Sequence, residues 1–146
     1  MSDSNMIYVL NGPNLNRLGL REPEIYGSET LDDIAAMLED RAGELGLAID
    51  LRQSNHEGHL IDWLHEAHGA GAKAVLLNAG AYTHTSIALY DAIRSIDTPV
   101  IEVHLSNLAV RERFRHRSWV GRAARASISG LGAQSYLSAL EAAARL

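Results

Sequence analysis

A tyrosine that follows two arginines in a long polar loop is the feature of this sequence that most suggests chemistry. Tyr26 comes after Arg17 and Arg21 in the segment 11–27, which reads NGPNLNRLGLREPEIYG. A fixed positive charge favours the ionised form of a phenol, and a tyrosinate can act as a base. Polar loops of this length in a short chain tend to be functional. The segment therefore predicts a proton-abstracting site, the alternative being a surface loop in which the arginines are solvated and Tyr26 only packs.

Short apolar runs alternate with amphipathic stretches along the rest of the chain. Near-continuous apolar strands in this order are typical of a parallel sheet covered by helices on both faces. We therefore predict an α/β fold, a flavodoxin-like doubly wound five-stranded parallel sheet with helices on both faces, formed by the single domain 1–146. Thr30, with Asp33 three residues later, and Asn55 are the expected caps of two helices. The strands are expected at 6–10, 48–53, 73–78, 100–104 and 126–129, and the helices at 31–45, 60–68, 86–96, 111–116 and 134–146.

Polar side chains follow the predicted strands at the points where the strands end. In open parallel sheets, ligands bind outside the carboxyl ends of the strands, near a topological switch point. Three asparagines, two histidines and several arginines should converge there. The chain has no GxGxxG or phosphate-loop sequence, which argues against a nucleotide ligand. The segments that follow the first four strands are 11–26, 54–57, 78–86 and 104–107, the last leading to Arg111, Arg113 and Arg115.

The composition excludes several classes of protein. The chain has no cysteine, which excludes disulfides, thiolate metal sites and a thiol nucleophile. A net charge of -5 argues against non-specific nucleic-acid binding, although the arginines of segment 111–125 offer a basic patch. Those arginines spread around a short helix and are interrupted by Glu112, which weakens that reading. The apolar runs are too short for a membrane span and the first residues do not form a secretory signal, so a cytoplasmic protein is expected.

Histidine pairs in the helix-like stretch 56–68 raise the alternative of a metal site. The pairs are His56 with His59 and His65 with His68. At about 100° per residue the two pairs point to opposite sides of the helix, so they cannot share one ion. Solvated or hydrogen-bonded surface histidines are therefore favoured, and no metal is expected.

Sequence blocks spread along the whole chain form a more specific signal. They are NGPNL with RLG at 11–19, REP leading to YG at 21–27, QSNHEG at 53–58, LNAG with THTS at 77–86, IEVHLSN at 101–107, the segment 111–115 and GLG at 130–132. In this order they resemble the type II 3-dehydroquinate dehydratases, the cofactor-free dehydroquinases of the shikimate and quinate pathways. The resemblance implies loss of water from 3-dehydroquinate to give 3-dehydroshikimate through an enolate, with no cofactor. It also implies a homododecamer built from trimers.

The resemblance also implies a role for individual residues. Tyr26 would remove the proton next to the ketone, and Arg21 would keep that phenol ionised. His104 would protonate the departing hydroxyl, with Glu102 orienting its ring. Asn14 would help to hold the water that stabilises the enolate oxygen. The implied substrate-binding positions are Asn78, His84, Asp91, Leu105, Ser106 and Arg115. Of these, Asp91 would contact the substrate of a neighbouring subunit. Arg17 and Arg111 lie in the same blocks without an assigned role.

The chemistry of such an elimination agrees with these residue types. It needs a base, a stabiliser for the developing oxyanion and an acid for the leaving hydroxyl. An arginine such as Arg115 can pair with the substrate carboxylate, while amide, imidazole and hydroxyl groups bind its hydroxyls. The alternative from another class is a non-enzymatic flavodoxin-like module that binds a small anion. A receiver-type module would need clustered acids after the first strand, where the sequence instead has Asn11, Gly12 and Pro13. The segment 118–122, SWVGR, departs from the family pattern and has no predicted structure.

Overall fold

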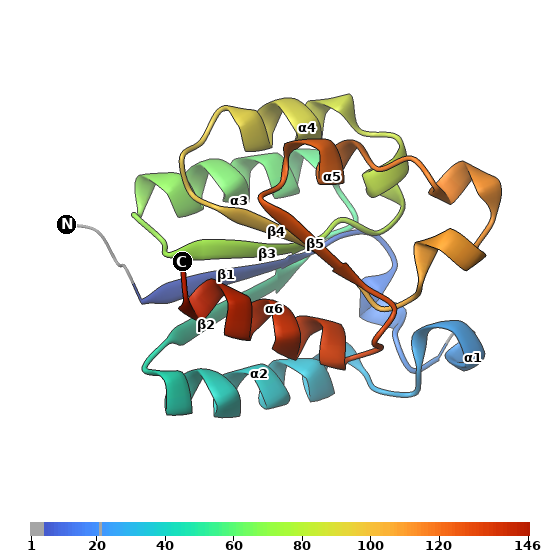
Figure 1. The fold of residues 1–146 in the computed structure, drawn as a ribbon, viewed down its shortest axis with the longest axis horizontal. Coiled ribbons are helices and arrows are strands. Elements are labelled where there is room, and N and C mark those ends of the chain that lie inside the picture. The colour runs from blue at the N-terminus through green and yellow to red at the C-terminus, as the bar shows by residue number, and fades with distance from the viewer. Residues whose placement is uncertain (1–4, 21) are drawn as a thin grey trace.

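Five parallel strands form one sheet with helices on both faces (Figure 1). The computed structural model describes residues 5–20 and 22–146. The strand order β2-β1-β3-β4-β5, with every neighbouring pair parallel, confirms the predicted flavodoxin-like doubly wound α/β fold. Within the described residues, no helix is long and apolar enough to cross a membrane. The strands are β1 (Met6–Asn11), β2 (Ala48–Gln53), β3 (Ala74–Asn78), β4 (Val100–His104) and β5 (Ala126–Ser129), and the helices are α1 (Pro23–Tyr26), α2 (Leu31–Leu45), α3 (Glu57–Gly69), α4 (Ile87–Arg94), α5 (Trp119–Ala123) and α6 (Gln134–Ala144).

Two apolar cores lie on opposite faces of the sheet because successive strand side chains point to opposite sides. On β1, Ile7 and Val9 pack against buried residues of α2 and α6. Tyr8 and Leu10, which alternate with them, pack against buried residues of α3 and α4. Figure 1 shows α2 and α6 together on one side, with α3, α4 and α5 on the other. The near-continuous apolar strands of the sequence therefore reflect burial on both faces.

The predicted boundaries agree best for the strands and for α2, whereas α3 begins at Glu57 instead of 60, and α4 and α6 end at Arg94 and Ala144 instead of 96 and 146. Every strand matches its prediction to within one residue, and Thr30 forms the predicted capping box with Asp33. The predicted cap Asn55 is wrong, because His56 precedes α3 and the Asn55 side chain is used elsewhere. Its Oδ1 accepts hydrogen bonds from the backbone N–H of Asn14, at 3.1 Å, and from the Gln53 side chain. Asn55 thus holds the loop after β1 instead of starting a helix.

The predicted helix 111–116 is also wrong. The chain forms a single 3-10 turn at Arg113–Arg115 and then α5, a helix that the sequence analysis did not predict. Ser118 starts α5 by accepting a hydrogen bond from the backbone N–H of Gly121. The regular helix therefore begins at this cap, after the run of alternating arginines.

The loops that carry polar residues meet at the carboxyl ends of β1 and β3, where the strand order reverses. Gly12 N–H donates to the carbonyl oxygen of Asn78 at 2.8 Å, so the two loops touch directly. Figure 1 shows α1 and the orange segment before α5 at this same end of the sheet. This is the position that the general rule for open parallel sheets assigns to a ligand site.

Substituting Gly12 by alanine should strongly destabilise the protein. A Cβ at residue 12 would lie 2.4 Å from the carbonyl oxygen of Ala79, a backbone atom that cannot rotate away. We expect a loss of about 1–3 kcal/mol in the free energy of unfolding measured in urea, the usual cost of overpacking. Gly43→Ala is the matched control, because nothing lies within 4 Å of the position that its methyl group would take and it sits inside α2. That control should gain about 0.4–1 kcal/mol, and equal effects at the two positions would contradict the steric argument.

Candidate active site

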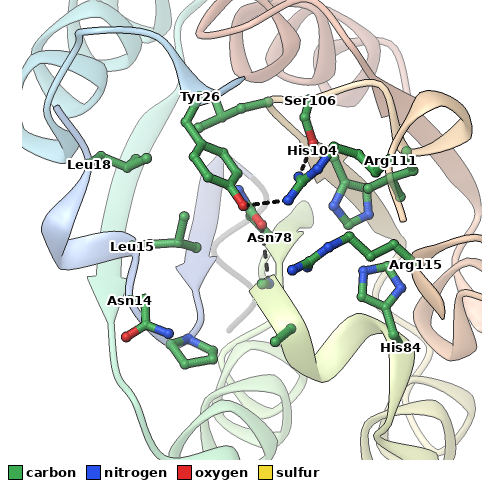
Figure 2. Close-up of a pocket in the computed structure, with 15 residues that line it drawn as sticks. Asn14, Leu15, Leu18, Tyr26, Asn78, His84, His104, Ser106, Arg111 and Arg115 are labelled. Carbon is green, nitrogen blue, oxygen red and sulfur yellow. Dashed lines mark hydrogen bonds between the residues drawn. The ribbon is translucent and has the colours of Figure 1, made fainter. Parts of the chain in front are cut away.

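A pocket of about 140 Å³ opens at the carboxyl ends of the central strands. Figure 2 shows side chains from the loop after β1, from α1 and from the ends of β3 and β4 pointing into it. A volume of this size suits a compact small molecule. The pocket is lined by Pro13, Asn14, Leu15, Leu18, Tyr26, Asn78, Gly80, Ala81, His84, His104, Leu105, Ser106, Leu108, Arg111 and Arg115.

Tyr26 contacts Arg111 in the pocket. The guanidinium Nη2 of Arg111 donates to the Tyr26 hydroxyl oxygen at 3.0 Å, and its Cζ lies 5.1 Å from the centre of the ring. Its Nη1 donates to the Ser106 hydroxyl at 2.9 Å, which fixes the direction of the guanidinium. A guanidinium is always charged and can only donate, so its hydrogen bond is compatible with a phenolate oxygen. Arg21, the residue expected beside Tyr26, lies outside the described residues.

His104 and Glu102 form a buried pair at the end of β4. Residues two apart on a strand share a face, and the imidazole Nε2 donates to the Glu102 carboxylate at 2.8 Å. Ser127 donates to the other carboxylate oxygen at 2.7 Å, and Ser118 donates to the first. Burial opposes ionisation, but the hydrogen bond and charge of His104 and the two hydroxyls together hold the pKa of Glu102 below its ordinary value. The carboxylate is therefore charged at neutral pH and orients the histidine ring.

Two elements brought to β4 by tertiary packing form the support around Glu102. Ser127 is its register partner on β5, and Ser118 is the residue before α5. Gly121 in α5 lies so close that a Cβ there would come 2.7 Å from the carboxylate. The unpredicted helix α5 thus packs directly on the buried charge, and a glycine allows this approach.

His84 presents a hydrogen-bond acceptor to the pocket. Its Nδ1 lies 2.8 Å from the carbonyl oxygen of Arg117, which can only accept, so Nδ1 carries the proton. Burial lowers the pKa of His84, and the nearby charges of His104 and Arg115 lower it further, against the raising effect of the Arg117 carbonyl. The ring is therefore neutral at neutral pH and its Nε2 keeps a lone pair. The ring stacks at 6.5 Å on that of His104.

The remaining predicted residues differ in how they meet the pocket. Arg115 reaches into it beside Asn78 (Figure 2), and Leu105 and Ser106 are also among its lining residues. Asn14 lies exposed at the rim, with a left-handed backbone φ of 68°. Asp91 lies exposed on α4 and does not line the pocket of its own chain. The structure therefore brings together every described residue of the predicted site except Asp91.

Three residues of the site received no role from the sequence. Arg111 contacts Tyr26 from 85 positions away, and Ser118 and Ser127 support Glu102 from other elements. The only sequence signal for Arg111 is its place in the arginine-rich block after β4. Serines give no comparable signal, because each depends on which strand or helix packs beside β4.

Removing the Ser127 hydroxyl should raise the pKa of Glu102 and reduce stability in a pH-dependent way. A carboxylate with a depressed native pKa stabilises the folded state above its unfolded pKa, about 4.5, and this stability is lost as pH falls through the native pKa. We expect Ser127→Ala to lower the free energy of unfolding by about 1–2 kcal/mol at pH 7, with the difference from the unsubstituted protein vanishing in acid. Urea unfolding across a pH series measures this. Ser129→Ala is the control, because Ser129 lies on the same strand and is equally exposed but is not among the described hydrogen-bond partners of Glu102. A pH-independent loss in Ser127→Ala would contradict the assignment.

Comparison with known proteins agrees with this geometry. The chain matches the family described as dehydroquinase class II over residues 5–144. It is 58% identical over 139 residues to 3-dehydroquinate dehydratase 1 of Agrobacterium fabrum, and the match covers 95% of each chain. It is 59% identical over 136 residues to 3-dehydroquinate dehydratase of Rhizobium meliloti, and that match covers 93% of this chain and 91% of the relative. The crystal structure of type II dehydroquinase from Propionibacterium acnes is similar over the full length of both chains, with a TM-score of 0.93 and 44% identity. The chain therefore belongs to the class II dehydroquinase family.

Proposed function

We propose that this pocket dehydrates 3-dehydroquinate to 3-dehydroshikimate through an enolate. The observation that carries the proposal is the contact of Tyr26 with Arg111 in the same pocket as the His104–Glu102 pair. A base and an acid are thereby available to one small ligand, and the relatives named above bear the name of this activity. The alternative of a non-enzymatic anion-binding module is not supported by membership of an enzyme family.

Tyr26 is the base in this mechanism. As a phenolate it takes the proton from the carbon next to the ketone, and the electron pair of that C–H bond becomes the enolate. Arg111 donates a hydrogen bond to the same oxygen at 3.0 Å, and this bond stabilises the negative charge of the phenolate. Arg21 remains a predicted second cation. Asn14, at the rim, would hold the water that donates to the enolate oxygen, a stabilisation that the elimination requires.

His104 is the acid in the second step. The enolate re-forms the ketone, the carbon–oxygen bond of the leaving hydroxyl breaks, and a proton from the imidazolium completes the departing water. Glu102 stabilises the positive charge of the imidazolium before this transfer and fixes which nitrogen faces the carboxylate. The turnover leaves Tyr26 protonated and His104 neutral, and transfer of that proton from the phenol to the imidazole through the solvent restores both groups, so the mechanism uses no cofactor.

The substrate is held by groups of complementary character. Arg115 supplies a cation for the carboxylate, and Ser106 a hydroxyl beside Arg111. His84 supplies a lone pair for a substrate hydroxyl, since its Nδ1 is already used by the Arg117 carbonyl. A cyclic acid that bears several hydroxyls satisfies these groups together.

Two substitutions should separate the two steps. Tyr26→Phe keeps the ring but removes the oxygen, so dehydration and exchange of the substrate's alpha proton should both fall by about 10²–10⁴, with binding nearly intact. His104→Ala should lose dehydration by a similar factor while exchange survives better. Dehydration is followed by the ultraviolet absorbance of the conjugated enone, and exchange by the incorporation of deuterium from the solvent.

Tyr82→Phe is the control for the loss of a phenol. Its hydroxyl donates to the carbonyl oxygen of Asn55, outside the pocket lining, so both steps should continue. Near-normal turnover in Tyr26→Phe would overturn the base assignment and leave His84 as the first alternative. Parallel loss of exchange and dehydration in His104→Ala would place His104 in binding or in the first step.

We further propose that the chain, as one catalytic domain of residues 1–146, assembles into a cytoplasmic homododecamer built from trimers. Asp91 supports assembly, because it is a predicted substrate contact that lies exposed and away from its own pocket. Ile87, one turn earlier on the same face of α4, is 54% exposed, which is typical of a surface covered by a neighbour.

Asp91→Ala should therefore weaken substrate binding and loosen assembly together. Light scattering combined with the KM for 3-dehydroquinate measures both effects. Asp40→Ala, an exposed aspartate on α2, is the matched control and should change neither. A fully active monomer would contradict the proposed assembly.

A further inference from the structure

A chain of buried hydrogen bonds connects the core of the protein to the active-site residue Asn78. The Tyr136 hydroxyl on α6, which is fully buried, donates to Oδ1 of Asn11 at 2.6 Å. The Nδ2 amide of Asn78 donates to the same hydroxyl oxygen at 2.8 Å. Asn11 and Asn78 are register partners at the ends of β1 and β3. Tyr136 thus bridges the two asparagines at the point where the strand order reverses.

Backbone groups at both ends fix the direction of every hydrogen bond in this chain. Asn11 Nδ2 faces the carbonyl oxygens of Val9 and Arg52, at 3.3 and 3.0 Å, which can only accept. Asn11 Oδ1 must therefore face Tyr136, whose hydroxyl must donate to it. At the other end, the backbone N–H of Gly80 donates to Oδ1 of Asn78 at 3.2 Å. Neither amide can flip without breaking bonds to the backbone.

We infer that Tyr136 is a positioning residue that locks Asn78 as a hydrogen-bond donor toward the substrate. One N–H of the Asn78 amide is used by Tyr136, and the second has no acceptor among the residues that the structure describes. Asn78 lines the pocket, so the free N–H is available to an oxygen lone pair of the ligand. This inference rests on the proposed function and adds to it a selection rule: the group that meets Asn78 is a hydroxyl, carbonyl or carboxylate oxygen.

Burial keeps the bridge in its donating form. It raises the pKa of Tyr136 well above its ordinary value, against the opposing effect of the Asn78 hydrogen bond. The hydroxyl therefore stays protonated at neutral pH and continues to donate to Asn11. An ionised phenol would leave Oδ1 of Asn11 without its donor and would break the chain at that point.

Tyr136→Phe tests the inference, because it removes only the bridging oxygen. We expect the KM for 3-dehydroquinate to rise about tenfold, the effect of one misplaced hydrogen bond, with kcat changed far less. Tyr8→Phe is the matched control, since Tyr8 is also buried and hydrogen-bonded, to Glu66, but lies outside the pocket lining. Thermal unfolding should show a loss of stability in both variants, whereas only Tyr136→Phe should change KM.

A double-mutant cycle with Asn78→Ala distinguishes positioning from a merely structural role. If Tyr136 acts through Asn78, Tyr136→Phe should no longer change kcat/KM once Asn78 is alanine. Equal losses with and without Asn78 would overturn the inference, as would an unchanged KM in Tyr136→Phe alone. An unsubstituted protein that does not dehydrate 3-dehydroquinate would instead contradict the proposed function.

A second variant keeps the inference testable if Tyr136→Phe does not fold. Asn78→Asp keeps the shape of the side chain but replaces the amide donor by an oxygen. Substrate binding should then be at least as weak as in Asn78→Ala, because a lone pair meets a lone pair. Binding as in the unsubstituted protein would show that the ligand does not use the Asn78 N–H and would overturn the inference.

Discussion

The direct backbone contact between the ends of β1 and β3 is the constraint on which the arrangement of the pocket at this end of the sheet depends. Gly12 donates to the carbonyl of Asn78, and the space beside residue 12 is filled by the backbone of Ala79. The contact places Asn11 beside Asn78, within reach of the single hydroxyl that bridges them. Because the strand order reverses at this point, the loops beyond it diverge and leave a pocket between them.

Charged groups in and around this pocket are stabilised by hydrogen bonds that also fix their orientation. Glu102 lies buried in the sheet, where an isolated carboxylate would be costly, but it receives donors from His104, Ser118 and Ser127. The mostly buried Arg111 donates to Ser106 and Tyr26 and lies 3.3 Å from a Glu112 carboxylate oxygen. The partners that lower the cost of burial are therefore the same ones that orient the groups to which we assign the chemistry.

In the proposed mechanism, specificity follows from the opposite hydrogen-bonding character of neighbouring groups. His84 offers a lone pair because a backbone carbonyl takes its proton, while Asn78 offers an N–H because Tyr136 and Gly80 take its other positions. Arg115 adds a fixed positive charge. A buried donor or acceptor left unpaired by the wrong ligand costs more than a matched pair gains, so such a pattern rejects analogues that reverse any one group.

The sequence by itself determined the strands, the capping box of α2, and the shared face of Glu102 and His104, because each depends on local periodicity or on residues a few positions apart. The family blocks also identified most of the pocket residues. Only the tertiary structure decided that Arg111 meets Tyr26, that Ser127 supports Glu102, and that Asn55 holds a loop instead of starting a helix. These contacts join segments that are distant in sequence, and they depend on strand register and packing, which local patterns do not encode.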